Sequence, residues 1–148
     1  MAGSAPKVKI SPKPGKKVAI ISASWHTDIC DALVRGAVKA MDEYGVAYET
    51  SYVPGSFELP LAAQLALDNG FDGAVVVGLV LKGETPHFDY VCDGVTQGVM
   101  NVCLTRSKPV GFGVLMCNDM AHAIARIGGD GAKEDKGYDA GIAALAFL

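Results

Sequence analysis

The sequence predicts an α/β fold, a three-layer αβα sandwich with a central four-stranded parallel sheet. Strand patterns at residues 18–22, 47–53, 74–81 and 109–116 alternate strictly with helical patterns. Such alternation favours parallel strands that are joined by right-handed crossovers, with helices on both faces of the sheet. The segment 74–81 is also apolar throughout, which is typical of a strand buried on both faces.

The N-terminal part of the chain divides into an arm and the start of the domain. Residues 1–16 are predicted to form a flexible arm, in which Val8 to Ile10 has the pattern of a short strand, and residues 17–148 a single domain. Asp28 to Tyr44 is predicted to be a helix, because apolar residues recur along one face and charged residues along the other. Gly45 follows in the usual C-terminal position of glycine.

Four further helical patterns follow the second strand. Before the helix predicted at residues 88–103, Thr85 suits a helix N-cap and Pro86 suits the first helical position. A glycine-rich linker separates the last two. The patterns cover residues 60–68, residues 88–103, a short helix at residues 119–127 and a final helix from about residue 135.

Charge and composition exclude several classes of protein. The net charge is −3, and because five of the thirteen basic residues lie in the first 17 positions, residues 18–148 carry 8 basic against 16 acidic groups. No basic face for nucleic acid is therefore expected. There is no apolar stretch long enough for a membrane span and no secretory signal core. The four cysteines lack CxxC spacing, which favours free thiols in a reducing, cytoplasmic environment.

The turn after the strand at 74–81 is the first candidate for a functional site. In parallel α/β sheets, ligands bind beyond the carboxyl ends of the strands. Gly83 allows the chain to approach a ligand closely, and the start of the following helix offers free N–H groups to an anion. His87 lies beside that point with a side chain that titrates near neutral pH. These residues suggest a small phosphorylated substrate next to an acid/base histidine; the alternative is an ordinary turn with a surface histidine.

Other polar and aromatic residues follow the remaining strands. Trp25 could stack on a flat heterocycle, or be partly buried against a neighbouring subunit. Glu58 could hold N–H or hydroxyl groups, or simply be a solvated carboxylate at a helix start. Arg126 and Lys136 could bind a phosphate, Arg126 being the better candidate, or be surface charges. His26 and His122 are weaker candidates, and the three histidines lack metal-ligand spacing, so no metal site is expected.

Together these segments resemble lumazine synthases, a family with a flavodoxin-like fold. The resemblance spans nearly the whole chain from Lys17. It depends on Val53-Pro54-Gly55-Ser56-Phe57-Glu58-Leu59-Pro60, on the run from Lys82 to Val91, on residues 112–115, and on residues 125–128 with 136–137. The segment from Met116 to His122 departs from the family pattern, in which threonines and a Glu-Gln pair are usual.

The resemblance implies a reaction and a set of site residues. A ribitylaminouracil would condense with 3,4-dihydroxy-2-butanone 4-phosphate to give 6,7-dimethyl-8-ribityllumazine, without cofactor or metal. His87 would shuttle protons. Substrate contacts would come from Trp25, Ser56, Phe57, Glu58, Leu79, Val80, Leu81, Glu84, Thr85, Phe112, Arg126 and Lys136. The alternative is a non-catalytic relative that binds flavins or acts as a scaffold.

The resemblance also implies a homopentamer with sites shared between neighbouring chains. One chain would supply Trp25, residues 56–58 and residues 79–87, and its neighbour Phe112, Arg126 and Lys136. The arm would add a strand to a neighbouring sheet. The nine residues between Arg126 and Lys136 resemble the longer linker of members that stop at pentamers. A pair of pentamers stays open as an alternative, and a sixty-subunit shell is disfavoured.

Overall fold

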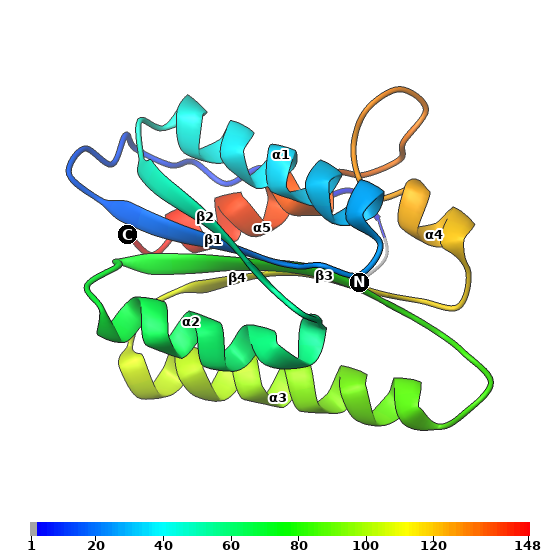
Figure 1. Cartoon of the computed structure of the whole chain (residues 1–148). Helices are drawn as coiled ribbons and strands as arrows, with labels where there is room; N and C mark the ends of the chain where they lie inside the picture. The colour runs from blue at the N-terminus through cyan, green and yellow to red at the C-terminus, as the bar shows by residue number, and fades with distance from the viewer. Residues whose placement is uncertain (1–2) are drawn as a thin grey trace.

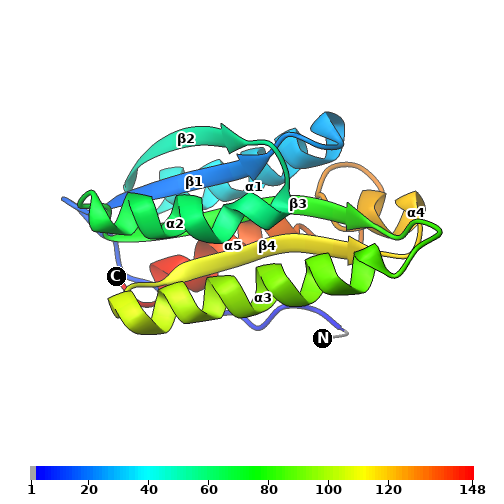
Figure 2. The same ribbon diagram turned by 60° about the horizontal axis from the view of Figure 1, so that its bottom comes forward.

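The computed structural model describes residues 3–148 and contains the predicted four-stranded parallel sheet. Its strands are β1 (Lys17–Ala23), β2 (Ala47–Val53), β3 (Gly73–Leu81) and β4 (Val110–Cys117). Their order across the sheet is β2-β1-β3-β4, and every neighbouring pair is parallel, as Figure 2 shows. This is the order of flavodoxin-like sheets, and it confirms the predicted fold class.

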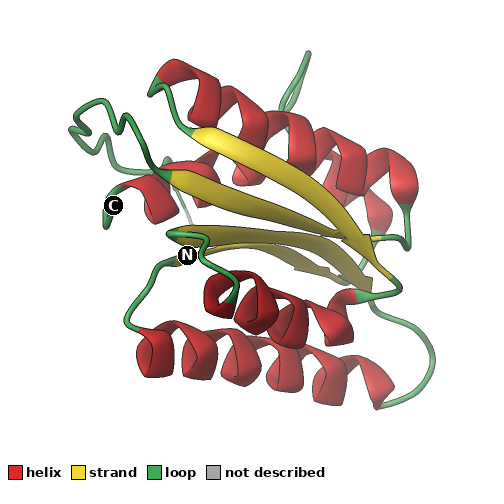
Figure 3. Cartoon of the chain, turned by 60° about the vertical axis from the view of Figure 1, so that its left-hand side comes forward, coloured by secondary structure: helices red, strands yellow, loops and turns green. Residues whose placement is uncertain are grey.

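Helices cover both faces of this sheet, as Figures 1 and 3 show. The helices α1 (Thr27–Glu43) and α5 (Lys136–Leu145) lie on one face, and α2 (Leu59–Asp68) and α3 (His87–Arg106) lie on the other. The short 3-10 helix η1 (Ser56–Glu58) leads into α2, and α4 (Met120–Ile124) follows β4. The three predicted layers are therefore present.

Alternating side chains of the strands fill two hydrophobic cores. In β1, Val18 and Ile20 pack toward α1 and α5, while Ala19 and Ile21 pack toward α2 and α3. The first seven residues of β3 are all buried, which confirms that the apolar segment is a central strand. By contrast, most of the edge strand β2 is exposed, so the two central strands carry most of the sheet's buried surface.

Glycines let α5 approach its neighbours closely. A Cβ added at Gly137 would collide with the Leu33 carbonyl oxygen of α1, and one added at Gly111 of β4 would collide with the Ala140 carbonyl oxygen. Backbone atoms cannot move aside as a flexible side chain can. This close packing fixes the position of α5, and with it the position of Lys136 at its first turn.

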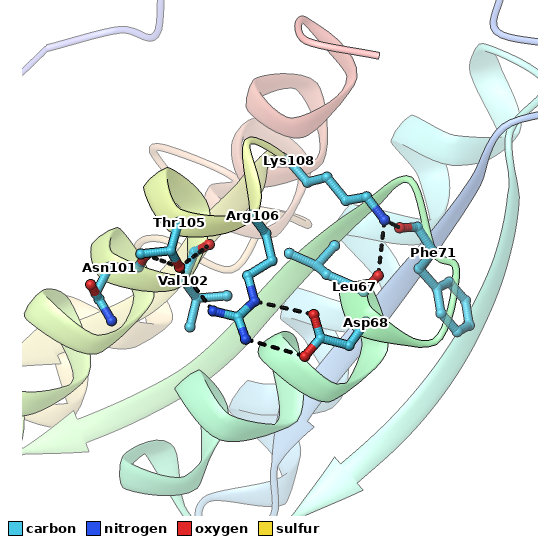
Figure 4. A network of polar contacts seen from close by, with 8 residues as sticks. All are labelled: Leu67, Asp68, Phe71, Asn101, Val102, Thr105, Arg106 and Lys108. Atoms are coloured by element: carbon cyan, nitrogen blue, oxygen red, sulfur yellow. Dashed lines mark hydrogen bonds and ion pairs between the residues drawn. The ribbon is translucent and has the colours of Figure 1, made fainter.

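A polar cluster joins α2 to α3 at the amino ends of the strands (Figure 4). The Arg106 guanidinium donates from Nε and Nη2 to the two carboxylate oxygens of Asp68, at 3.1 and 3.2 Å. Lys108 Nζ donates to the carbonyl oxygens of Leu67 and Phe71, at 2.9 and 3.0 Å. These carbonyls lie at and beyond the end of α2, where cations are favoured. The contacts hold the ends of α2 and α3 together.

Two predicted helix boundaries were wrong. Helix α3 begins at His87, with Pro86 before it and no side-chain capping bond, so Thr85 is not the N-cap. Helix α4 ends at Ile124, three residues before the predicted end, and Arg126 lies in the turn that follows. The backbone leaves the helix there because Ile127 forms an antiparallel bridge with Asp135, and Lys136 N donates to Arg126 O at 2.9 Å. The glycine-rich linker is therefore closed at its base.

Residues 3–16 of the predicted arm contain no helix or strand in the single chain. The segment is nevertheless attached to the domain near its end. Lys13 donates from its backbone N–H to the Tyr44 carbonyl at 3.1 Å and from Nζ to the Leu148 carbonyl at 2.6 Å. Ile10 packs against the core that α1 and α5 form with the sheet.

Candidate active site

A cavity of about 410 Å³ lies where the chain leaves the carboxyl ends of β1, β2 and β3. The neighbouring strands β1 and β3 lead into helices on opposite faces of the sheet. Ligands in this fold usually bind beside the carboxyl ends of two such strands. Eight of the thirteen predicted site residues line this cavity: Trp25, Ser56, Phe57, Glu58, Leu79, Val80, Leu81 and His87. The fold thus brings together residues that span more than sixty positions of the chain, namely residues 25, 56–58, 79–81 and 87.

Contacts with the first turn of α1 fix the Trp25 loop. The Trp25 carbonyl accepts a hydrogen bond from Cys30 Sγ at 3.1 Å, and the His26 carbonyl accepts from the backbone N–H groups of Ile29 and Cys30, both at 3.0 Å. His26 adopts the left-handed conformation, at φ 54°. Burial raises the pKa of the Cys30 thiol, so the thiol stays protonated and able to donate. The Trp25 side chain remains 69% exposed on this hydrogen-bonded loop, available as a flat platform.

Glu58 has a local structural contact as well as a place in the cavity. Its Oε2 accepts a hydrogen bond from the Gly55 N–H at 2.9 Å, which closes the turn before α2. Glu58 therefore does act at the start of the helix, which is the alternative that the sequence left open. A Cβ at Gly55 would lie 3.3 Å from both Glu58 Oε2 and Trp25 Cδ1, so this glycine lets the carboxylate and the indole lie close together.

Ser56 contributes a buried hydroxyl without a partner. Its side chain is buried, at 6% exposure for the residue, and its Oγ has no hydrogen-bond partner among residues 3–148. A Cβ at Gly78 of β3 would come within 2.5 Å of that oxygen, so the hydroxyl lies directly over the strand. An unsatisfied buried hydroxyl costs about 1–3 kcal/mol.

The remaining residues of the β3–α3 connection are arranged less closely. His87 is the first residue of α3 and lines the cavity together with Val91 of the same helix. Glu84 and Thr85 are exposed and line neither this cavity nor the second cavity described below. The structure of the single chain therefore does not bring these two residues into either cavity.

A second cavity, of about 640 Å³, lies between β4, the turn after α4 and α5. The other three predicted residues, Phe112, Arg126 and Lys136, line it together. It has no residue in common with the first cavity. The predicted site residues thus form two separate groups within one chain.

Ion pairs organise the cations of the second cavity. Arg126 donates from Nη1 to the His122 carbonyl at 2.7 Å, and its Nε lies 3.4 Å from Glu134 Oε2. Lys136 Nζ lies 3.1 Å from Glu134 Oε1 and 3.4 Å from Asp139 Oδ2. Partial burial lowers the pKa of Lys136, but the Glu134 and Asp139 carboxylates outweigh it, so that the pKa is raised overall. Lys136 therefore stays charged at neutral pH.

Three polar residues of the site were not predicted. His26 lines the first cavity and His122 the second, although both were judged weak from the sequence. Glu134 lies between Arg126 and Lys136. In the sequence, Glu134 is only an acidic residue within the linker. Nothing in the spacing of the residues shows that the linker folds back and places Glu134 between two cations.

Three further properties concern the described residues as a whole. No group of three or more His, Cys, Asp or Glu side chains within residues 3–148 is arranged to hold a metal ion. All four cysteines are free thiols. No helix in this part of the chain has the length and hydrophobicity that a membrane crossing requires.

Comparison with known proteins identifies the family. The family model for 6,7-dimethyl-8-ribityllumazine synthase matches residues 15–148. The chain is 46% identical over 143 residues to the 6,7-dimethyl-8-ribityllumazine synthase of Streptomyces coelicolor, which covers 96% of this chain and 89% of the relative. It is 53% identical over 131 residues to the enzyme of the same name from Paenarthrobacter aurescens, covering 88% and 81%. The chain therefore belongs to the 6,7-dimethyl-8-ribityllumazine synthase family.

Proposed function

We propose that this chain is a transferase that condenses 5-amino-6-(D-ribitylamino)uracil with 3,4-dihydroxy-2-butanone 4-phosphate to give 6,7-dimethyl-8-ribityllumazine. This is the penultimate step of riboflavin biosynthesis. Membership of the family supports the activity. The structural observation that carries the proposal is the first cavity, in which an exposed indole, a buried unpartnered hydroxyl and a histidine lie together.

The first cavity is the proposed site of the pyrimidine substrate. Trp25 would stack on the heterocycle, because hydrogen bonds hold its loop and its indole is exposed. The Ser56 hydroxyl would gain the hydrogen-bond partner that it lacks in the free chain. Phe57 and Glu58 would contact the ring and the ribityl chain, and residues 79–81 would form the apolar wall.

The second cavity is the proposed anchor of the butanone phosphate. Arg126 suits a phosphate because its guanidinium can donate two parallel hydrogen bonds, and Lys136 adds a second charge. Phe112 would form a wall of this half of the site. Glu84 and Thr85, at the start of α3, would meet the phosphate from the other half, where free N–H groups favour an anion.

His87 is the proposed proton shuttle. Imine formation, loss of phosphate and ring closure each need a proton to move at a defined atom, and an imidazole can both donate and accept near neutral pH. The other contacts would hold the two substrates in a reactive orientation, which itself supplies a large part of the acceleration. The proposed chemistry requires neither a metal nor a cofactor.

The separation of the two cavities supports a shared site in a homopentamer. One chain would offer the pyrimidine half and its neighbour the phosphate half, so that a single chain is incomplete. Exposed apolar residues on the outer side of α3, among them Tyr90, Met100 and Leu104, provide surface for such contacts. The free thiols of the described residues are consistent with a cytoplasmic location, which we include in the proposal.

A steady-state assay of lumazine formation from the two substrates tests this function. We expect turnover well above the spontaneous condensation. Binding of the pyrimidine without turnover above that background would instead identify a non-catalytic relative, and the proposal would be wrong.

A further inference from the structure

Helix α3 has two glycines on the face that begins at the first cavity. His87 and Val91 line that cavity, and Gly94 and Gly98 follow them at spacings of three and four residues, which keep all four on one face of a helix. Glycine inside a helix is less favourable than alanine, so close packing is the usual reason for finding it there. Each of these two glycines faces a different residue near the start of α2.

Gly94 faces the aromatic ring of Phe57. A Cβ added at Gly94 would lie 2.7 Å from Cε2 of this ring, and the next nearest atoms, both at 3.5 Å, are Cδ2 and Cζ of the same ring. Carbon atoms pack at about 3.5–4.0 Å, so a side chain at position 94 and the ring cannot both keep their places. Phe57 is 60% exposed, so the ring can move aside without opening a void in a core. The missing side chain at position 94 therefore decides where the ring lies.

The Phe57 ring belongs to the wall of the first cavity. Phe57 comes from η1, and α3 contributes His87 and Val91 to the same cavity. Gly94 lies one turn further along α3 and provides the bare surface on which the ring rests. Aromatic contacts depend on the relative placement of the two rings. A displacement of Phe57 off α3 would therefore change the contact that a heterocycle in this cavity can make.

We propose that Gly94 is a positioning residue of the pyrimidine site, which sets the place of the Phe57 ring in the first cavity by leaving room for it against α3. The inference rests on the proposed function for the identity of the ligand. Gly94 acts through Phe57 and does not itself line the cavity. Larger side chains at position 94 should then weaken binding of the pyrimidine while leaving the fold intact.

Gly98 provides a matched control on the same face of the same helix. A Cβ at Gly98 would lie 2.8 Å from both Cβ and Cγ of Pro60, whose ring is bonded to the backbone in the first turn of α2. Neither Gly98 nor Pro60 lines the first cavity. Gly98→Ala therefore adds the same methyl group to α3, but against a rigid neighbour outside the site.

The test measures binding of 5-amino-6-(D-ribitylamino)uracil to the intact assembled protein. Trp25 is the only tryptophan of the sequence and lines the same cavity, so quenching of its fluorescence reports occupancy without turnover. The melting temperature of each variant is measured alongside. KM for each of the two substrates provides a second readout.

We expect Gly94→Ala to weaken binding of the ribitylaminouracil roughly 3- to 10-fold, the range for losing one aromatic contact. Its melting temperature should equal or exceed that of the wild type, because alanine favours the helix and the exposed ring can yield. KM for the pyrimidine should rise in parallel, with KM for the butanone phosphate unchanged. Gly98→Ala should bind the ribitylaminouracil as the wild type does and melt at a lower temperature, because Pro60 cannot yield.

A double variant shows whether Gly94 acts through the ring. Leucine at position 57 lacks the outer ring atoms that Gly94 faces. Phe57→Leu should therefore weaken binding by itself, and adding Gly94→Ala should have no further effect. A further loss in the double variant would overturn the proposal, because Gly94 would then act without the ring.

Two other results would also overturn the proposal. One is unchanged binding of the ribitylaminouracil by Gly94→Ala. The other is an equal loss of binding in Gly98→Ala, because α3 as a whole would then have shifted. Gly94→Ser places a Cβ at the same position and serves as a second variant should the alanine substitution fail to fold.

The binding measurement separates this proposal from the proposed function. If the wild type makes no lumazine but binds the ribitylaminouracil, and Gly94→Ala weakens that binding, the proposed function fails and the positioning role stands. If the wild type is active and Gly94→Ala binds as tightly, only the positioning role fails. A wild type that does not bind the ribitylaminouracil would overturn both.

Discussion

At the scale of single residues, His87 is the side chain whose loss should affect chemistry most. We expect His87→Ala to lower kcat about 10²-fold, the lower end for losing a general acid or base, with smaller changes in the two KM values. His26→Asn is the matched control, because it alters the other histidine of the cavity while asparagine tolerates the left-handed backbone there. The measurement is kcat from pH 6 to 8. Unchanged turnover of His87→Ala across this range would rule out the proton shuttle.

Arg126 should act on one substrate only. We expect Arg126→Gln to raise KM for the butanone phosphate and leave KM for the pyrimidine nearly unchanged, because the phosphate dianion loses its bidentate partner. Arg106→Gln serves as a control, since this arginine pairs with Asp68 in the cluster at the opposite end of the sheet. Equal increases in both KM values for Arg126→Gln would contradict the assignment.

The sequence singled out most of the side chains that line the two cavities, but not the residues that hold them in place. Trp25 and Glu58 follow directly from strand ends, where local pattern determines position. Glu134 and Cys30 act through contacts that depend on how a linker folds back and how a loop meets a helix. Spacing along the chain contains no direct signal for such contacts, which explains why these residues were missed.

At the scale of elements, the joint between α2 and α3 should weaken in acid. The hydrogen bonds from Arg106 lower the pKa of Asp68 below its ordinary value of 3.8. A carboxyl group whose pKa is lower in the folded than in the unfolded protein stabilises the fold at pH values above the unfolded pKa. This contribution is lost as the pH falls through the folded pKa. We therefore expect Asp68→Asn to lower the melting temperature at pH 7, by an amount that shrinks as the pH falls below about 4.

Thermal unfolding of the wild type and Asp68→Asn at several pH values between 7 and 3 provides the measurement. Asp130→Asn, which changes an exposed carboxylate outside this joint, should show no such pH-dependent difference. A constant difference between wild type and Asp68→Asn down to pH 3 would mean that the ion pair does not contribute.

The four strands and the helices α1 and α2 were predicted to within one residue at each end, because each has its own hydrophobic period and most have a glycine or proline at a boundary. The apolar face that predicts α3 ends at Cys103, three residues before the helix does. Helix α4 was predicted too long because the pattern of residues 125–127 continues a helix, whereas the backbone is drawn into a bridge with Asp135. Thr85 was misassigned because two neighbouring residues both suit a helix start. Tertiary contacts decided these ends.

At the scale of the whole molecule, we expect a pentamer. With chains of 15.4 kDa, a pentamer has a mass of roughly 77 kDa and a sixty-subunit shell roughly 924 kDa. The long linker between Arg126 and Lys136 would disturb the close packing that a shell requires, even though its base is closed. Light scattering at neutral pH measures the mass. A shell-sized particle would contradict the linker argument, and a stable monomer would contradict the shared site.

The two cavities share no lining residue, so the two halves of a site can be damaged separately in different chains of a mixed assembly. If neighbouring chains complete each site, a chain damaged in one half can still lend its intact half to the chain beside it. Two impaired variants, His87→Ala and Arg126→Gln, should show roughly a quarter of the wild-type activity at low concentrations of the butanone phosphate when they are unfolded together and reassembled at equal amounts, since random mixing makes one site in four wholly intact. Defects that impair each variant alone would thus partly complement one another, as in alleles that rescue one another within a single gene.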